Sequence, residues 1–123
     1  MHTFLIIVPE GGMLFESAGI ADILMQANRL RPDDAPLYQM AIVTTQTHRV
    51  VHGSSGLNLL ADHRLADLDP EVARDTIIVT GKGATEEESA FVVDWLRRAA
   101  PKARRVASVC GGAMLLAEAG LLD

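Results

Sequence analysis

Three short, largely apolar runs constrain the fold of this chain more than any other feature. They span residues 4–8, 76–80 and 105–109, and a proline, a glycine or a Cys-Gly pair closes each of them. A run without polar alternation is typical of a strand that is covered on both faces, as in a parallel sheet. We therefore predict that all three are strands and that residues 4–8 form a central one.

Helical patterns separate these runs. The first follows a turn at residues 10–12 and ends at the loop residues 31–34, after which residues 39–45 predict another strand. One face of this helix is predicted to be buried because its apolar residues recur at helical spacing. These residues are Ile20, Ile23, Leu24, Ala27 and Leu30.

A second helix is predicted between Thr85 and Pro101. Thr85 and Glu88 have the spacing of a capping box, in which the two residues satisfy free N–H groups at the start of a helix. The predicted buried face consists of Phe91, Val92, Trp95 and Leu96. A last helix is predicted over residues 113–119, and Gly120 is its expected C-terminal stop.

The segment 48–69 is less regular. Val50-Val51 is predicted to be a short edge strand, residues 53–56 a loop, and Leu65 and Leu68 a cover for the sheet edge. Taken together, the element order predicts an α/β fold with a doubly wound, mostly parallel sheet and helices on both faces. Ligands bind beyond the carboxyl ends of such strands, so the loops 10–12, 81–83 and 110–112 should converge on one site.

Composition narrows the class of protein. The 123 residues, of which 49% are hydrophobic, are enough for one domain over residues 1–123, and the net charge of −5 argues against nucleic-acid binding by this chain itself. A single cysteine excludes an internal disulfide and fits a reducing compartment. The opening apolar run is too short for a signal peptide or a membrane span, so we expect a cytoplasmic protein without membrane contact.

The chain's one cysteine lies where a predicted strand gives way to a helix. Cys110 is followed at once by Gly111, Gly112 and Ala113. A sharp strand-to-helix turn requires small neighbours, as in the serine elbow of the α/β-hydrolases. The start of a helix also favours a thiolate there. The alternative is a buried, inert cysteine that packs as a small hydrophobic residue.

Three fragments together resemble the PfpI/ThiJ branch of the class I glutamine amidotransferase-like superfamily. They are residues 4–11, with Phe15, Glu16 and Asp22 downstream, residues 77–84 and, most specifically, residues 106–122. Within the superfamily the chain looks most like the N-terminal domains of GlxA-type AraC-family transcriptional regulators, and it is also similar to isonitrile hydratase. The resemblance covers nearly the whole chain and implies a flavodoxin-like sheet.

The resemblance implies roles at five positions. Cys110 matches the elbow cysteine, and Glu16 matches the acidic residue that hydrogen-bonds this thiol in many members. The backbone N–H groups of Gly111 and of the Gly81-Lys82 turn match the donors of an oxyanion hole, although Lys82 replaces the usual second glycine of that turn. A neutral Glu16 would donate to the sulfur, whereas an ionised Glu16 would repel a thiolate. Without the resemblance, Glu16 would be read as a solvated first-turn glutamate.

The chain departs from hydrolytic members of the superfamily at its end. Those members place a histidine shortly after the region where this chain finishes, whereas His2, His48, His52 and His63 all precede Cys110. We expect the domain to lack its C-terminal elements. His48 or His52 would have to reach the thiol from the irregular segment, and exposed loop histidines are the simpler interpretation.

Three functions stay open from the sequence. The first is a ligand-sensing, homodimerising domain of a GlxA-like AraC-family regulator, which binds a small metabolite near Cys110 and contacts DNA only through a domain absent from this chain. The second is a cysteine-dependent hydrolase or hydratase, isonitrile hydratase-like or amidase-like, with Cys110 as nucleophile and Glu16 as proton-handling partner. The third is a redox protein in which Cys110 oxidises to a sulfinate. No Cys/His cluster has metal-ligand spacing, so neither a metal nor a cofactor is expected.

Overall fold

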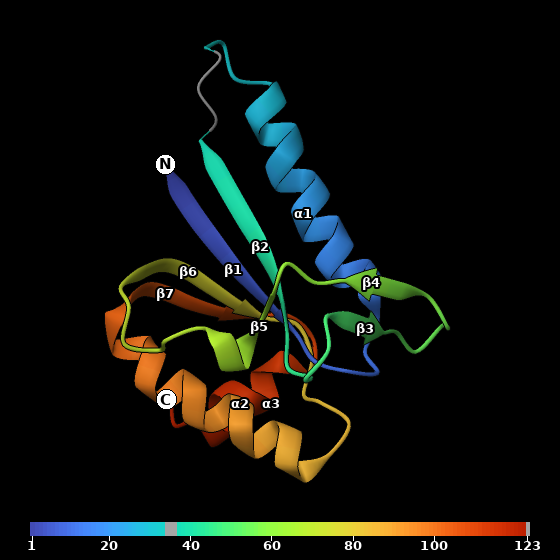
Figure 1. The fold of residues 1–123 in the computed structure, drawn as a ribbon. Helices are drawn as coiled ribbons and strands as arrows, with labels where there is room; N and C mark the ends of the chain where they lie inside the picture. The colour runs from blue at the N-terminus through green and yellow to red at the C-terminus, as the bar shows by residue number, and fades with distance from the viewer. Residues whose placement is uncertain (34–36, 123) are drawn as a thin grey trace.

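A five-stranded parallel sheet forms the centre of the protein, which a computed structural model describes over residues 1–33 and 37–122. The strand order is β5–β2–β1–β6–β7, and every neighbouring pair is parallel (Figure 1). The strands are β1 (His2–Val8), β2 (Tyr38–Thr44), β5 (His63–Arg64), β6 (Arg74–Val79) and β7 (Ala103–Ser108). The predicted α/β fold is confirmed, and the central place of β1 explains its apolar carboxyl half.

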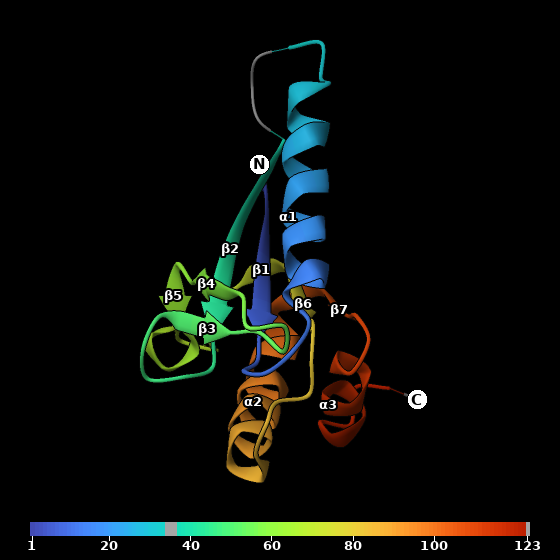
Figure 2. The ribbon, with the colours of Figure 1, turned by 90° about the vertical axis from the view of Figure 1, so that its right-hand side faces the viewer.

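Helices cover both faces of the sheet, as the two views of the ribbon show (Figures 1 and 2). Helix α1 (Leu14–Arg29) packs on one face, where Ile6, Val8 and Ile42 meet Leu14. Helices α2 (Glu86–Ala99) and α3 (Gly112–Glu118) pack on the other. Short 3-10 helices η1 and η2 span Leu65–Asp67 and Ala100–Lys102. No helix in the described ranges is both long and apolar enough to cross a bilayer.

The irregular segment forms a hairpin of its own. Strand β3 (Val50–His52) pairs antiparallel with β4 (Asn58–Leu60), apart from the main sheet. The predicted strand at Val50-Val51 is therefore confirmed, but its placement at the sheet edge is wrong. The edge strand beside β2 is instead β5. The sequence does not signal β5 because this strand has only two residues and both are polar.

The predicted buried face of α1 is partly wrong. Leu14 and Ser17 are the buried residues of this helix, whereas Ile23 is 71% exposed and Leu30, just past the helix end, is 76% exposed. Ile23 lies well round the helix from the line through Leu14 and Ser17, so it points away from the sheet. Asp34, in the loop predicted after this helix, lies outside the described residues.

Helix α2 begins and ends as predicted. The Thr85 side chain accepts a hydrogen bond from the Glu88 N–H at 3.1 Å, and the helix ends at Ala99, before Pro101. Val92, Trp95 and Leu96 are buried, but Phe91 is 37% exposed, so its assignment to the buried face is wrong. Val93 and Ala99 are buried instead.

Candidate functional site

Cys110 occupies a strained turn between β7 and α3. The Val109 N–H donates to the Val79 carbonyl at 2.9 Å, which fixes the end of β7 against β6. The next residue, Cys110, has φ of +51°, the left-handed region that a non-glycine residue seldom adopts. Its side chain is exposed, so the alternative of a buried, inert cysteine is wrong. Strain of this kind persists where the surrounding structure holds it, and it is frequent at functional sites.

Gly112 explains why small residues follow the cysteine. A Cβ atom at this position would overlap the carbonyl oxygen of Val79 and lie 2.7 Å from its carbonyl carbon. The start of α3 therefore rests directly on the end of β6. This contact holds the Cys110 turn above the carboxyl edge of the sheet.

The turn at Lys82 touches the turn at Gly111. A Cβ atom on Gly111 would lie 3.4 Å from the Lys82 backbone nitrogen. The Ser89 hydroxyl donates to the Lys82 carbonyl at 2.6 Å and so fixes the orientation of the peptide that follows. Within residues 1–33 and 37–122, no group accepts a hydrogen bond from the N–H of Gly111 or of Lys82. Two such amides are suited to an anionic or carbonyl oxygen.

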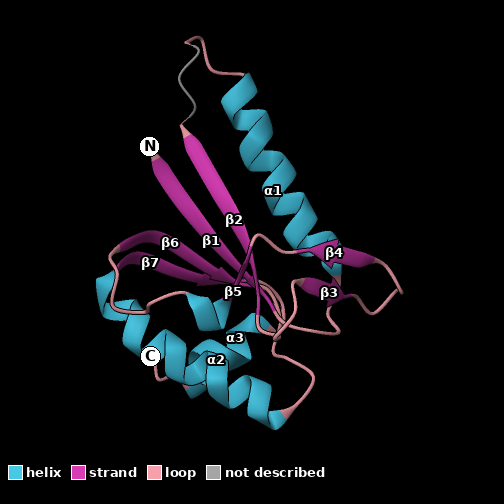
Figure 3. Ribbon diagram, in the orientation of Figure 1, coloured by secondary structure: helices cyan, strands magenta, loops and turns pink. Residues whose placement is uncertain are grey.

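The loops predicted to converge do meet at one end of the sheet (Figure 3). Residues 9–12 and 81–84 enclose a cavity of about 210 Å³ between the ends of β1 and β6. A wider groove of about 470 Å³ lies on the other side of Lys82, between the start of α2 and Met114 and Glu118 of α3. Lys82, which is exposed, borders both hollows.

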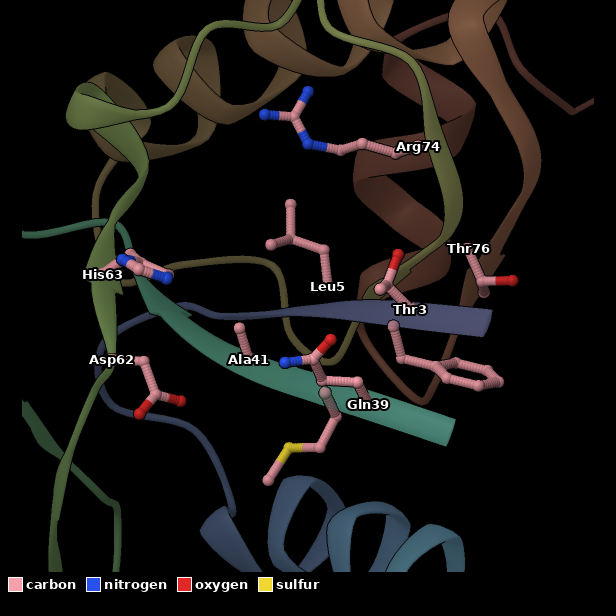
Figure 4. Close-up of a pocket in the computed structure, with 10 residues that line it drawn as sticks. Thr3, Leu5, Gln39, Ala41, Asp62, His63, Arg74 and Thr76 are labelled. Carbon is pink, nitrogen blue, oxygen red and sulfur yellow. The ribbon is translucent and has the colours of Figure 1, made fainter. Parts of the chain in front are cut away.

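A third hollow, of about 410 Å³, lies elsewhere. Asp62 and His63 line one side and Thr3 and Thr76 the other, near the amino ends of β1 and β6 (Figure 4). Arg74 also lines it, but this side chain already donates to the carbonyls of the 69–72 loop and lies 5.2 Å from the centroid of the Trp95 ring. Burial lowers the pKa of Arg74. The sequence does not reveal this hollow, because the residues that line it come from β1, β2 and β6 and from the segment at the start of β5.

The buried carboxylate of Glu88 accepts hydrogen bonds from three loops near the site. Glu88, 8% exposed, accepts hydrogen bonds from the Glu10 N–H and the Thr45 hydroxyl, each at 3.0 Å. It also accepts from the Gln46 side chain at 3.0 Å and from the Ala84 N–H at 3.4 Å. The loops that follow β1, β2 and β6 are thus fixed to the first turn of α2. The sequence indicates a capping role for Glu88, but not this one.

Glu16 lies in the first turn of α1 and is half-buried. Among the described residues, its carboxylate forms no hydrogen bond with the Cys110 sulfur or with any other group. The pairing of Glu16 with Cys110 stays a prediction.

Among the described residues, no histidine forms a hydrogen bond with Cys110. His2 Nε2 is 2.7 Å from the Thr76 hydroxyl, and His63 is on the edge strand β5. His48 and His52 are exposed and lie beside Glu10, and one ligand atom of each of these three residues falls within 4.8 Å of the others. Glu10 lies in the loop after β1 and His52 ends β3, 42 residues later, so ligand spacing alone does not reveal this cluster.

Comparisons with known proteins find a relative by sequence and similar folds among solved structures. An uncharacterized protein in the cpoL 5' region of Streptomyces lividans is 33% identical over 124 residues, with 99% of this chain and 82% of that protein covered. An AraC family transcriptional regulator from Pseudomonas putida superposes with a TM-score of 0.74 at 22% identity, over 100% of this chain and 63% of its own. Drosophila melanogaster DJ-1beta gives 0.72 at 20% identity, over 98% and 61%.

This chain therefore spans less than two thirds of the length of those two solved structures, and their identities show the fold alone. The DJ-1/PfpI family itself matches residues 6–123, which confirms the resemblance predicted from the sequence. On that match, together with the Streptomyces relative, the chain belongs to the DJ-1/PfpI family.

Proposed function

We propose that this chain is the ligand-sensing and dimerising domain of a cytoplasmic AraC-type transcriptional regulator, and that it binds a small polar metabolite beside Cys110. The observation that carries the proposal is the contact between the Cys110-Gly111 turn and the Lys82 turn, each with an N–H group that has no acceptor among the described residues. Similarity of fold to a Pseudomonas putida AraC family regulator supports it. DNA would be contacted by a separate domain, in keeping with the net charge of −5.

The contacts that the histidines make favour binding over catalysis. In cysteine hydrolases the nucleophile is normally activated by a base beside its thiol. His2 contacts Thr76 and His52 contacts Glu10, and within residues 1–33 and 37–122 none of the four histidines forms a hydrogen bond with Cys110. Lys82 instead offers a cation at the rim of the cavity, which suits a metabolite with a carboxylate.

Backbone amide NMR spectra of the chain, titrated with a panel of amino acids and small carboxylic acids, would test this proposal. We expect saturable shifts at Gly111 and Lys82 with the compound left intact. Lys82→Ala should weaken binding of an anionic compound about tenfold, because a charged hydrogen bond is lost. Lys102→Ala, which removes a lysine beyond the carboxyl end of α2, is the matched control and should change nothing.

The second candidate is a cysteine-dependent hydrolase or hydratase. The left-handed Cys110 turn favours it, as do the N–H groups of Gly111 and Lys82, which have no acceptor in the part of the chain that the structure describes. Here Cys110 would attack a carbonyl or isonitrile carbon, Glu16 would handle the proton, and Gly111 and the Gly81-Lys82 turn would hold the developing oxyanion. Consumption of a bound amide or isonitrile that stops in Cys110→Ser would favour this candidate over the sensor.

Dimerisation is proposed through the outward side of α1. Phe15 is 81% exposed and Ile23 71% exposed, and Leu30 follows at the helix end. Apolar side chains gathered on one exposed helix are typical of a protein interface. We expect Ile23→Glu to shift the chain toward monomer in analytical ultracentrifugation at micromolar concentration. Leu60→Glu, at an equally exposed apolar residue of β4, is the control. A sedimentation profile unaltered by Ile23→Glu would exclude this surface.

A further inference from the structure

We propose that Glu10, His48 and His52 form a binding site for a divalent transition metal ion of the Zn²⁺ type. One ligand atom from each residue lies within 4.8 Å of the others. The three residues come from the loop after β1, the loop before β3 and the end of β3. This proposal does not rest on ligand binding at Cys110, although Glu10 also lines the cavity beside Lys82.

The Glu10 carboxylate is already oriented for such a role. Its Oε1 accepts a hydrogen bond from the His52 N–H, and its Oε2 lies 3.2 Å from the His52 Nδ1. In a tetrahedral site with metal–ligand bonds of about 2.0–2.1 Å, neighbouring ligand atoms are about 3.3 Å apart. The Glu10–His52 pair therefore already has the separation of two ligands of one metal ion.

The backbone beneath the cluster is held at several points. The Gly11 N–H donates to the His52 carbonyl at 2.9 Å, and the Ser54 N–H donates to the Gly12 carbonyl at 2.9 Å. The Glu10 N–H is bound by the buried Glu88 carboxylate. Two of the three ligands thus sit on fixed backbone, which lowers the entropic cost of assembling a site.

His48 is the member that must move. It is exposed, and its ring lies 5.7 Å from the His52 ring, centroid to centroid, in an edge-on arrangement. Closing the cluster from 4.8 Å to tetrahedral spacing requires a shift of about 1–2 Å, which a rotamer change of an exposed side chain provides. An exposed Glu10–His52 ion pair alone contributes about 0–1 kcal/mol and gives no reason for the second imidazole.

The ligand set selects the kind of ion. Two imidazoles with one carboxylate suit Zn²⁺, Ni²⁺ or Cu²⁺, whereas Mg²⁺ and Ca²⁺ prefer sites made of oxygen atoms. Three protein ligands leave a fourth position for water or an outside group. His52 is 58% exposed in its side chain and Glu10 20%, so an ion can reach the site from solvent.

Isothermal titration of the metal-stripped chain with ZnCl₂ at neutral pH tests the proposal. We expect one Zn²⁺ per chain with a micromolar Kd and no binding of Mg²⁺. His48→Ala and His52→Ala should each weaken Zn²⁺ binding at least about tenfold, as should Glu10→Gln. His63→Ala removes an exposed histidine outside the cluster and is the matched control. Titration with Co²⁺ should give the visible absorption of a tetrahedral ion in the unaltered chain and lose it in His48→Ala.

The Cys110 thiolate is the competing zinc ligand, so the titrations are repeated in Cys110→Ser. Retention of the tight Zn²⁺ site in that variant is expected. Loss of binding in Cys110→Ser, unchanged binding in the His48→Ala/His52→Ala double variant, or no saturable Zn²⁺ binding in the unaltered chain would each overturn the proposal. Because His48 is an exposed loop residue, its alanine variant should fold normally even if Glu10→Gln does not.

Discussion

Replacing Gly112 with alanine is expected to destabilise the protein by about 3 kcal/mol or more and to displace the Cys110 turn. The added methyl group would overlap the Val79 carbonyl oxygen and lie 2.7 Å from its carbonyl carbon. Backbone atoms of a central strand cannot give way as a flexible side chain does. The start of α3 must therefore lift from β6. Urea unfolding measures the loss of stability, and the rate of Cys110 alkylation by iodoacetamide reports the geometry of the turn.

Two other glycines provide controls for this result. Gly111 has an ordinary φ of −63°, and a Cβ atom there would approach the Lys82 nitrogen to 3.4 Å, so Gly111→Ala should cost less than about 1 kcal/mol. Gly19, inside α1, has nothing within 4 Å of its Cβ position, so Gly19→Ala should stabilise by about 0.5–1 kcal/mol. Unfolding of Gly112→Ala at the same urea concentration as the unaltered chain would show that α3 is not seated on β6 as described.

The strands were predictable because their signal is local. A central strand of a parallel sheet contacts helices on both faces, so residues 4–8 and 76–80 carry few polar side chains whatever the rest of the chain does. The sharp turn at Cys110 was predictable for a similar reason, since small residues directly after a strand are typical of a crowded turn into a helix, although its left-handed φ was not predicted. The edge strand β5 has no such signal, because partners on one side only require no apolar pattern.

The helix faces were harder to assign. Ile23 and Phe91 fit an apolar stripe as well as their buried neighbours do, and only the packing of the sheet decides which side turns inward. The helical period leaves a stripe broad enough for an error of this kind. An exposed apolar residue on a helix therefore either lies at the border of the buried apolar stripe or belongs to a protein interface. The sequence alone does not distinguish the two cases.

The cysteine and the turns of the site were predictable from the sequence, but the residues that hold the turns in place were not. Ser89, which fixes the Lys82 carbonyl, and the cluster of Glu10, His48 and His52 depend on contacts between loops. Such contacts depend on the register of β1, β2 and β6, which no local pattern records. Glu88 is the extreme case, since three of its four partners lie 42 to 78 residues away in sequence.

Glu88→Ala is expected to lower the free energy of unfolding by about 3 kcal/mol or more. The change removes the acceptor of the Glu10 N–H, the Thr45 hydroxyl, the Gln46 amide and the Ala84 N–H. Each partly buried donor that loses its partner costs about 1–3 kcal/mol, less where water replaces the carboxylate. Hydrogen exchange should also accelerate at the amides of Glu10 and Ala84, which a loss of packing in α2 alone would leave protected.

Glu88→Gln and Glu87→Ala separate the network from helix capping. Glutamine keeps the shape but turns one oxygen into an NH₂ group facing a donor, so a loss of about 1–2 kcal/mol is expected. Glu87 is an exposed neighbour in the same first turn, and its removal should cost no more than about 0.5 kcal/mol through the helix dipole. The Thr85 side chain accepts its hydrogen bond from the backbone N–H of residue 88, so that cap survives in all three variants. Equal losses in Glu88→Ala and Glu87→Ala would mean that the carboxylate only stabilises the helix start. A loss confined to Glu88, with faster exchange at Glu10, would establish that one side chain of α2 fixes the two loops, 9–12 and 81–84, that line the cavity beside Lys82.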